Sequence, residues 1–412
     1  MPIFPRSADQ WLLGRISRAI GPAPIRIALA NEETTSKVDA VATVIIPDRK
    51  TLARLMLDPE VAFGEAYTDG TLHVQGSLVK LLEAISQARE HTGGALYSRL
   101  ASRWMHWLQA NTLRGSRRNI HAHYDLGNDF YKLWLDTQLV YTCAYFPAPT
   151  ATLEQAQTAK MEHVCRKLRL QPGETVVEAG CGWGALALHM ARQYGVSVKA
   201  FNVSNEQIAF ARERAREEGL SHQVEFIEDD YRNISGKFDV FVSVGMLEHV
   251  GLENYKDLAD VIYRSVGESG RGLLHFIGRN RVAPFSRWIR KHIFPGAYIP
   301  VIRHAVEMFE RWNYSVLDVE NLRHHYAKTL EHWLDRFERS QHQVASMYDA
   351  NFLRAWRLYL SGSLAAFRSG SLQLFQIVFA GSRCLPVWWT RAQLYSQGQP
   401  EIEKPEWINA MS

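Results

Sequence analysis

Thr175-Val-Val-Glu-Ala-Gly-Cys-Gly-Trp-Gly-Ala-Leu-Ala-Leu-His-Met-Ala-Arg-Gln-Tyr194 is the stretch that decides the fold. Its mostly apolar start predicts a buried strand, and Ala185 to Tyr194 predicts a helix. Between them, glycines alternate at positions 180, 182 and 184, where missing side chains allow a sharp turn and a close approach to a ligand. Because free N–H groups point outward from a helix N-terminus, the loop predicts a nucleotide-type binding site.

The glycine spacing does not identify the nucleotide, because Gly180, Gly182 and Ala185 also fit the dinucleotide pattern G-x-G-x-x-A. Two other positions favour S-adenosylmethionine over NAD. Glu178 is placed to meet the cationic amino-acid end of that cofactor. The second expected strand ends at Asn202, whereas NAD sites usually have a carboxylate there for the ribose. We therefore expect S-adenosylmethionine.

Several residues near the loop have more than one interpretation. The third expected strand ends in Glu228-Asp-Asp-Tyr231, where a carboxylate can accept from the adenine amino group, although Asp229 fits a solvated turn better. Gln207 fits either a cofactor contact or the second half of a capping box begun by Ser204. Cys181 is expected to pack as a small side chain, because a strand end beside a helix leaves little access for a nucleophile.

The expected elements alternate between helix and strand around this loop. A helix from Leu153 to Leu168 is opened by Thr152 and Gln155 at capping-box spacing. The order predicts a doubly wound parallel sheet, and the aromatic-rich sequence after Gly278 is expected to be mostly helical and to form a lid. The expected strands are Thr175 to Ala179, Val196 to Val203, Val224 to Glu228, Phe238 to Val244 and Gly272 to Ile277.

The sequence before the loop predicts a small α+β domain. Strands are expected at Ile25 to Ala30 and Val38 to Ile46, a helix from near Arg49, and a turn-rich stretch from Gly64 to Gly70. Arginine and tryptophan residues cluster in the segment from Ser98 to Arg118, which we interpret as a linker helix. It fits binding to a membrane surface slightly better than the alternative, an amphipathic helix packed on the catalytic domain. The predicted division is an N-terminal domain with this linker at 1–115, a catalytic domain at 116–395 and a tail at 396–412.

Composition narrows the class of protein. The 412 residues are 46% hydrophobic and 22% charged, close to a globular average, and the net charge of +4 is too small to indicate nucleic-acid binding. No apolar run approaches the roughly 20 residues of a membrane span, so a cytoplasmic protein is expected. Four cysteines lie far apart without a CxxC pair, which argues against a zinc site or disulfides. They are Cys143, Cys165, Cys181 and Cys384.

Further motifs lie outside the loop. They are His123 to Tyr131, Tyr141 to Phe146, Ser243 to Gly251, Leu274 to Gly278, Ile293 to Pro300, Asp318 to Leu330 and Trp356 to Leu360. In this order, and over roughly Asn119 to Val378, the chain resembles the cyclopropane-fatty-acid and mycolic-acid methyltransferase family. A weaker likeness covers Ala62 to Gly70.

The resemblance implies a fold and an activity. The fold would be a Rossmann-like class I S-adenosylmethionine methyltransferase sheet with a helical lid, preceded by the small α+β domain. The activity would add a methylene across the double bond of an unsaturated phospholipid acyl chain, with bound bicarbonate as the base, at the inner face of the membrane. Three alternatives stay open: a related enzyme that leaves a branched or oxygenated chain, a lipid-binding member without turnover, and a small-molecule methyltransferase. A homodimer is a further possibility.

The resemblance also implies site residues. The bicarbonate neighbours would be Cys143, Glu248, His275, Ile277 through its backbone, and Tyr326. The cofactor contacts would be Tyr141, Thr142, Glu178, Gly180, Cys181, Gly182, Gly184, Asn202, Gln207 and Asp230. Departures from the family pattern are Glu178 for Asp, Thr142 for Ser, Asn202 for Thr, Ala297 for Gly and Val301 for Ser.

The implied chemistry explains these residue types. An alkene that attacks the sulfonium methyl becomes a carbocation, which needs an anionic surround, a base and the exclusion of water. His249 is expected only to orient its neighbours. The segment from Trp288 to Phe294 fits binding to anionic lipid headgroups, but packing on the catalytic domain is expected instead. One set of aromatic side chains fits both core packing and cation stabilisation: Tyr124, Phe130, Tyr131, Tyr145 and Phe146.

Overall fold

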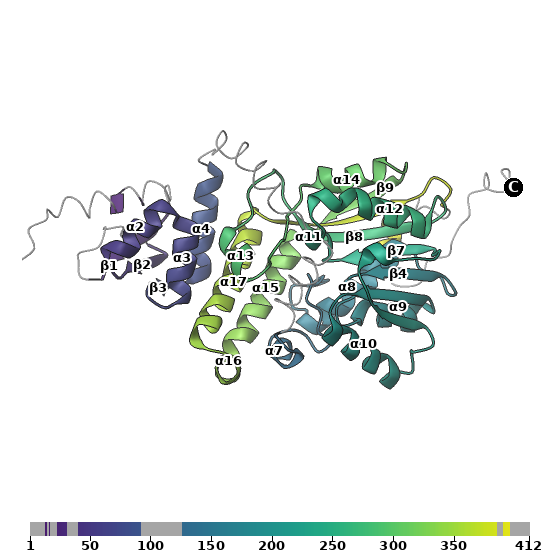
Figure 1. Cartoon of the computed structure of the whole chain (residues 1–412), viewed down its shortest axis with the longest axis horizontal. Coiled ribbons are helices and arrows are strands. Elements are labelled where there is room, and N and C mark those ends of the chain that lie inside the picture. Colours follow the sequence, from purple (N-terminus) through teal and green to yellow (C-terminus); the bar gives the residue numbers. More distant parts are fainter. Residues whose placement is uncertain are drawn as a thin grey trace, which may run out of the picture. The chain divides into compact units, whose positions relative to one another are not determined.

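A computed structural model describes residues 13–14, 16, 23–30, 40–91, 126–384 and 390–395 (Figure 1). The chain divides into two compact units. The sheet unit comprises Val140–Phe276, Ile302–Asn321 and Phe375–Ser412, and the helical unit comprises Met1–Leu139, Ile277–Val301 and Leu322–Leu374. The expected membrane-binding segment from Ser98 to Arg118 lies outside the described residues.

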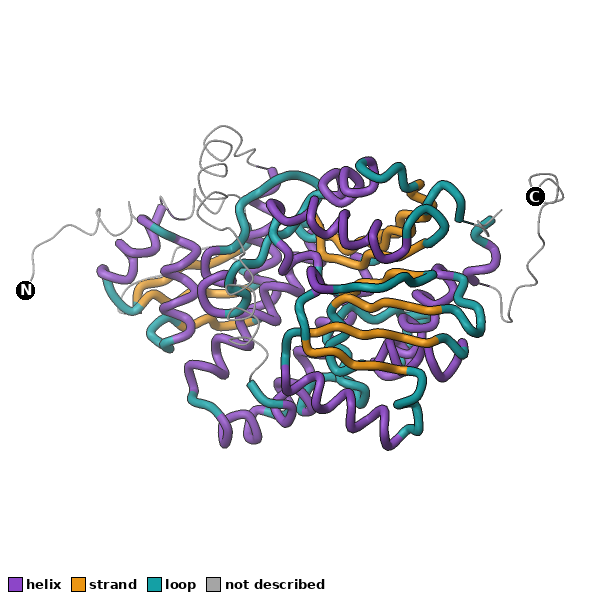
Figure 2. Tube along the Cα trace, turned by 45° about the vertical axis from the view of Figure 1, so that its right-hand side comes forward, coloured by secondary structure: helices purple, strands orange, loops and turns teal. Residues whose placement is uncertain are grey.

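The sheet unit contains a seven-stranded sheet in the order β6-β5-β4-β7-β8-β10-β9 (Figure 2). The first five of these strands pair in parallel, as the doubly wound prediction required. The strands are β4 (Thr175–Ala179), β5 (Ser197–Asn202), β6 (Val224–Glu228), β7 (Val240–Val244), β8 (Arg271–Gly278), β9 (Ser315–Asn321) and β10 (Gln373–Ala380).

Helices flank this sheet and bury its faces. Helices α9 and α10 pack on β5 and β6, and α8 packs on α9. Helix α12 packs on β7, and α14 packs on β9. The expected capping box opens α8, where Thr152 and Gln155 each satisfy a backbone N–H of the other. These helices are α8 (Leu153–Leu168), α9 (Ala185–Tyr194), α10 (Asn205–Glu217), α12 (Tyr255–Val266) and α14 (Ile302–Glu310). Short elements are η1 (Tyr231–Asn233), α11 (Leu247–Val250), η2 (Leu252–Asn254) and α18 (Ala392–Tyr395).

The sequence after Gly278 is mostly helical, as expected, but it also forms the strands β9 and β10, which were not expected. They pair antiparallel, with Phe375 opposite Asn321 and Ala380 opposite Ser315. All eight residues of β10 are buried, so its sequence lacks the alternation that marks a half-exposed strand. Its pairing partner lies more than fifty positions earlier in the chain, a contact that local patterns do not report.

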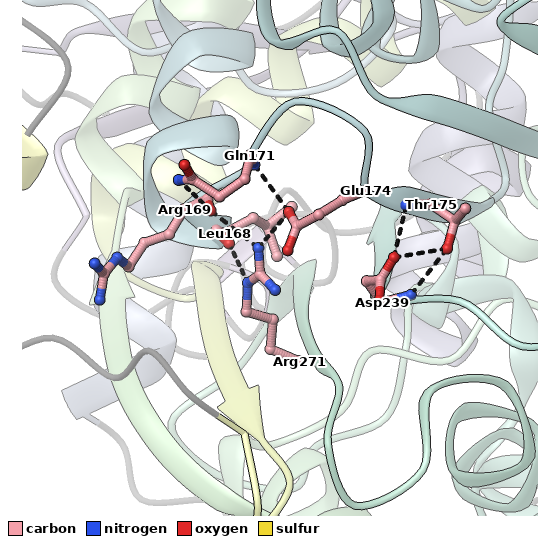
Figure 3. Close-up of polar contacts among 7 residues, drawn as sticks. All are labelled: Leu168, Arg169, Gln171, Glu174, Thr175, Asp239 and Arg271. Atoms are coloured by element: carbon pink, nitrogen blue, oxygen red, sulfur yellow. Dashed lines mark hydrogen bonds and ion pairs between the residues drawn. The ribbon is translucent and has the colours of Figure 1, made fainter. Parts of the chain in front are cut away.

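A polar cluster joins the amino ends of three strands (Figure 3). Arg271 at the start of β8 forms an ion pair with Glu174 at 2.7 Å and donates to the carbonyls of Leu168 and Arg169. Asp239, before β7, accepts from the backbone N–H and the hydroxyl of Thr175, each at 2.8 Å. The cluster therefore stabilises the edge of the sheet opposite to the glycine loop, which follows the carboxyl end of β4.

The helical unit carries a three-stranded sheet in the order β1-β2-β3, with β1 and β2 parallel and β3 antiparallel to β2. Its described helices include the long pair α15 and α17, and α17 also packs on α3 and α4. The elements are β1 (Ile25–Leu29), β2 (Ala42–Ile46), α2 (Arg49–Leu57), α3 (Pro59–Thr68), β3 (His73–Gly76), α4 (Leu78–His91), α7 (Asn128–Lys132), α13 (Arg287–His292), α15 (Arg323–Arg339), α16 (Gln341–Met347) and α17 (Ala350–Ser369).

The turn predicted from Gly64 to Gly70 was wrong, because most of it lies in α3. Asp58 caps this helix and Pro59 occupies its first turn, a strong start signal that outweighs the two glycines. A Cβ at Gly64 would lie 2.2 Å from the ring of Trp288, so the glycine permits close packing of α13 on α3. Trp288 is buried, as expected for a packed helix.

Among the described helices, none combines the length and apolar character required to cross a bilayer.

Candidate active site

The glycine loop follows β4 and adopts the conformation that its sequence demands. Gly180, Gly182 and Gly184 have φ values of 86°, 54° and 82°, a region that residues with a Cβ rarely adopt. A Cβ at Gly184 would lie 2.5 Å from the ring of Phe226, whereas one at Gly182 would meet nothing within 4 Å. Gly184 therefore allows α9 to pack on the sheet, and Gly182 leaves the backbone open to a ligand.

Glu178 lies on β4, two residues before the loop, and is buried. Its Oε2 atom has no hydrogen-bond partner among the described residues. Burial raises the pKa of Glu178 to about 7, and the nearby charge of Lys160 opposes this rise. A buried carboxyl oxygen without a partner fits a cationic ligand group such as the ammonium of S-adenosylmethionine.

Asn202 and Gln207 meet beside the same loop. The Asn202 Nδ2 atom lies 2.6 Å from Gln207 Oε1 and 3.4 Å from the carbonyl of Gly182. Ser204 caps α10 by accepting from the backbone N–H of Gln207, but the Gln207 side chain turns to Asn202 and does not close a capping box. The buried Nε2 atom of Gln207 has no described partner and remains available to a ligand.

The carboxylates after β6 stabilise the local turn. Asp230 is buried and accepts from the backbone N–H of Arg232 at 3.0 Å, which caps η1. Asp229 accepts from the side chain of Asn233 at 2.8 Å, in agreement with its interpretation as a turn residue. That Asp230 also contacts the cofactor stays a prediction.

Helix α8 holds the segment that contains Tyr141, Thr142 and Cys143. Gln157 donates to the carbonyls of Val140 and Thr142 at 3.2 and 2.8 Å, and Lys160 donates to the Thr142 hydroxyl at 3.2 Å. Both anchoring side chains are buried. Sequence reasoning missed them, although polar residues three positions apart on the buried face of a helix are a usable signal.

The ends of β7 and β8 converge on this segment. The backbone N–H of Gly245 donates to the carbonyl of His275 at 2.8 Å, and a Cβ at Gly245 would lie 2.9 Å from the Thr142 side chain. Glu248 follows on α11 and is buried. Thr142, His275 and the start of the Glu248 helix therefore lie at the same carboxyl edge of the sheet as the glycine loop.

His275 is a buried, neutral imidazole. Burial and the charges of Lys160 and Lys167 hold its pKa well below the usual range. Gln376 on β10 places its Nε2 atom 3.1 Å from His275 Nδ1. Because an amide nitrogen donates, Nδ1 accepts and the ring proton resides on Nε2, which has no described partner. Sequence reasoning missed Gln376, because the strand that carries it was not expected.

The remaining predicted residues are distributed as follows. Cys143 is buried in the sheet unit, whereas Ile277 and Tyr326 belong to the helical unit. Tyr326 packs there on Phe367 and Trp333, with ring centroids 4.5 and 5.9 Å away. That these residues form one bicarbonate site with Glu248 and His275 stays a prediction.

Two further expectations concern side chains near the loop and the motifs. Burial raises the pKa of Cys181, so its thiol is protonated and packs in the core beside the sheet. Burial lowers the pKa of His249 to about 4, so this imidazole is neutral. Phe130 is fully buried and contacts Trp134 and Trp356 edge-on, which is core packing in the helical unit. Tyr124 lies outside the described residues.

The sheet order, the glycine loop and the buried acid define a class I methyltransferase that uses S-adenosylmethionine. The family model described as mycolic acid cyclopropane synthetase matches residues 111–377, and a model described as a domain of unknown function matches residues 18–93. The chain belongs to the mycolic acid cyclopropane synthetase family.

Relatives extend beyond the catalytic part. A "Probable fatty acid methyltransferase" of Pseudomonas putida is 35% identical over 366 residues, which cover 86% of this chain and 91% of the relative. The "Cyclopropane-fatty-acyl-phospholipid synthase" of Escherichia coli K12 is 35% identical over 353 residues, which cover 83% and 88%.

Solved structures agree with this family. The cyclopropane synthase MmaA2 of Mycobacterium tuberculosis has a TM-score of 0.62 and 29% identity, covering 64% of this chain and 98% of that chain. The mycolic acid cyclopropane synthase CmaA1, complexed with SAH and CTAB, has a TM-score of 0.61 and 30% identity, covering 64% and 97%.

Proposed function

We propose that this protein is a cyclopropane-fatty-acyl-phospholipid synthase, which transfers a methylene from S-adenosylmethionine to the double bond of an unsaturated phospholipid acyl chain. The observation that carries the proposal is the buried carboxyl and imidazole pair, Glu248 and His275, at the same sheet edge as the glycine loop. The relative of Escherichia coli, which aligns over most of both chains, supports the choice of substrate.

The cofactor supplies an electrophilic methyl group on sulfur. In the proposed reaction the alkene π electrons form a new bond to this methyl carbon while the sulfur–carbon bond breaks, leaving S-adenosylhomocysteine and a carbocation on the acyl chain. Loss of one proton from the new methyl closes the ring, so the net products are the cyclopropane lipid, S-adenosylhomocysteine and a proton. Glu178, Asn202 and Gln207 would hold the cofactor through the polar atoms described above.

Bicarbonate would supply the base that accepts this proton. The Nε2–H of His275 fits the recognition of such an anion, because it is buried and has no described partner. Because the imidazole is neutral, it donates one hydrogen bond through Nε2–H and carries no acidic proton that could protonate the bound base. The hydroxyl of Tyr326 and the backbone of Ile277 complete the proposed set.

Burial of the site supports a reaction through a carbocation. Water that reached this intermediate would trap it as an alcohol, so the reacting atoms need a dry surround. Cys143 and His275 each have at most 2% of their surface exposed. We further propose that the enzyme acts at the inner membrane surface on lipid in the bilayer, and that it self-associates.

A second candidate function is methylation without ring closure. The relative of Pseudomonas putida is named a probable fatty acid methyltransferase, and the "Tuberculostearic acid methyltransferase UfaA1" of Mycobacterium tuberculosis is 31% identical over 384 residues, which cover 86% of this chain and 87% of that relative. The same carbocation leads to either outcome.

Product analysis separates the two candidates. The purified chain is incubated with S-adenosylmethionine and dioleoylphosphatidylglycerol vesicles, and the lipid is analysed by mass spectrometry and proton NMR. A gain of one CH₂ with loss of the alkene signal supports ring closure. Retained unsaturation or an added oxygen atom refutes it and supports the second candidate.

A further inference from the structure

The helical unit contains a polar cavity of about 970 Å³. Residues from five places in the sequence line it: α3, α4, the connection between β8 and α13, the start of α15, and the turn between α17 and β10. Three arginines, Arg279, Arg281 and Arg323, face a single described carboxylate, Glu60. The cavity therefore has an excess of positive charge.

Arg279 is the most constrained of these arginines. Its Nη1 atom donates to the carbonyls of Ala283 and Pro284 at 2.9 and 2.8 Å, which fixes the guanidinium in place. Its Nε atom is buried and has no hydrogen-bond partner among the described residues. Burial lowers the pKa of Arg279 to about 10, although Tyr298 and Glu60 oppose this effect. A partly buried guanidinium whose buried Nε–H is unused fits an anionic ligand.

Arg323, a second arginine of the lining, contacts the end of α17. Its Nη1 atom donates to the carbonyls of Phe367 and Arg368, each at 3.2 Å. Gly370 has a φ of 90°, and a Cβ there would lie 3.0 Å from this Nη1 atom, so glycine permits the close approach. The guanidinium is therefore held against the turn that leads into β10.

Hydroxyl groups complete the polar lining. The hydroxyls of Ser369 and Ser371 lie 3.0 Å apart at this turn, and Ser286 contributes a third hydroxyl. Glu60 already accepts from the backbone N–H of Arg287 at 2.7 Å, which partly satisfies its charge. Fixed guanidinium groups beside hydroxyl donors match the oxygens of a phosphate group, because arginine binds phosphate through two parallel N–H donors.

We propose that this cavity binds the anionic phosphodiester of the phospholipid substrate. The proposal rests on the proposed function. It adds a binding site for the headgroup of the lipid, for which the sheet unit offers no described residue. In the sequence, Arg279 follows His275 by four residues and Arg323 precedes Tyr326 by three. Arg279 directly follows β8, the strand that carries His275, and α15 carries both Arg323 and Tyr326.

Kinetics with two lipids test this assignment. Arg281 is exposed, so Arg281→Gln should fold normally, and Arg279→Gln removes the partly buried guanidinium. Arg339→Gln, on an exposed part of α15, is the matched control. With dioleoylphosphatidylglycerol in mixed micelles, we expect KM to rise about tenfold in either cavity variant, the value of one charge-assisted hydrogen bond. With uncharged monooleoylglycerol, KM should not change in any variant.

A binding measurement separates this proposal from the proposed function. Glycerophosphoglycerol and inorganic phosphate are titrated into wild type and Arg281→Gln by calorimetry, with no turnover required. Binding of glycerophosphoglycerol that Arg281→Gln weakens supports the cavity even if no lipid is methylated, in which case only the proposed function fails.

Two results would overturn the assignment. One is an unchanged KM for phosphatidylglycerol in both cavity variants when wild type methylates this lipid well. The other is a site that binds inorganic phosphate as tightly as glycerophosphoglycerol while the variants leave lipid kinetics intact, which would identify a free-phosphate site. Thermal unfolding of Arg279→Gln and Arg279→Lys checks that a rise in KM reflects the lost contact and not partial unfolding.

Discussion

The side-chain amide of Gln376 lies 3.1 Å from Nδ1 of His275, and both residues are buried. They are more than a hundred positions apart in the chain, on β10 and β8, which are neighbours in the sheet. Because the amide N–H donates to Nδ1, the ring proton resides on Nε2, the nitrogen that faces away from Gln376. Gln376 is therefore a positioning residue for the proposed anion site.

Replacement of Gln376 tests this role. In Gln376→Leu the imidazole loses the donor that fixes its tautomer, so kcat should fall about tenfold to a hundredfold. The dissociation constant of S-adenosylmethionine should not change, because the cofactor residues lie on other strands. Gln343→Leu, on the exposed side of α16, is the control. Equal losses in kcat and in cofactor binding would point to a general structural defect instead.

Cofactor binding should depend on pH through Glu178. Burial raises the pKa of this carboxyl to about 7 in the ligand-free protein, so it is largely protonated below that pH. Only the carboxylate attracts the ammonium of S-adenosylmethionine. Affinity should therefore increase as pH rises through 7 and fall again at alkaline pH, where the α-amino group of the cofactor loses its own proton at about pH 8. Calorimetric titrations across this range can measure both changes.

Glu178→Gln provides the matched test, in which cofactor affinity should fall and lose its rise through pH 7. The same substitution should also remove a pH dependence of the free energy of unfolding. A carboxyl whose pKa is raised from 4.5 to about 7 favours folding below pH 4.5 and loses that contribution as pH rises through 7. Between pH 4.5 and 7 the free energy of unfolding of the wild type should thus fall by up to about 3 kcal/mol relative to that of Glu178→Gln. Parallel pH profiles of unfolding in the two proteins would contradict the assignment.

Lys160 interacts both with Glu178 and with the segment before α8. Its ammonium lowers the pKa of Glu178 and donates to the Thr142 hydroxyl. Lys160→Met should move the midpoint of the pH dependence of cofactor binding upward, because the carboxylate loses a stabilising charge. Lys199→Met, which removes a half-exposed lysine on β5, should leave the midpoint unchanged. Identical midpoints in all three proteins would exclude Lys160 from this role.

The polar cluster at the amino ends of the strands should affect stability without affecting the site. Arg271→Met leaves the Leu168 carbonyl without its side-chain donor and removes the charged partner of Glu174, which keeps only the backbone N–H of Gln171. Because breaking a buried ion pair costs about 3 to 5 kcal/mol and Glu174 is partly exposed, we expect a loss of about 3 kcal/mol. Urea unfolding measures this loss, with the exposed Arg383→Met as the control. Cofactor affinity at a temperature where the variant is folded should match wild type, since the glycine loop lies at the other end of β4.

Local sequence patterns predicted the centre of the fold well. The bounds of β4, β6, α8 and α9 agree with the expected ranges because each has strong local signals, such as the capping box at Thr152 and the glycines after Ala179. Strands β9 and β10 were missed, since a fully buried strand lacks alternation and gains its stability from a partner far away in the chain.

The site shows the same division. Glu178 and the glycine loop follow from residue types and short spacing, whereas Gln157, Lys160 and Gln376 act through contacts with distant segments. Such side chains can be found only after the pairing of strands and helices is known. A buried polar residue on an otherwise apolar face is the one signal that would have marked Gln157 and Lys160 in advance.

Methyl transfer from labelled S-adenosylmethionine into phospholipid vesicles tests the central claim most directly. Vesicles of dioleoylphosphatidylglycerol and of saturated dipalmitoylphosphatidylglycerol are compared under the same conditions. We predict label only in the unsaturated lipid, together with upfield cyclopropane protons in its NMR spectrum. Absence of label from both lipids, with rapid methylation of a soluble amine or phenol, would contradict the claim.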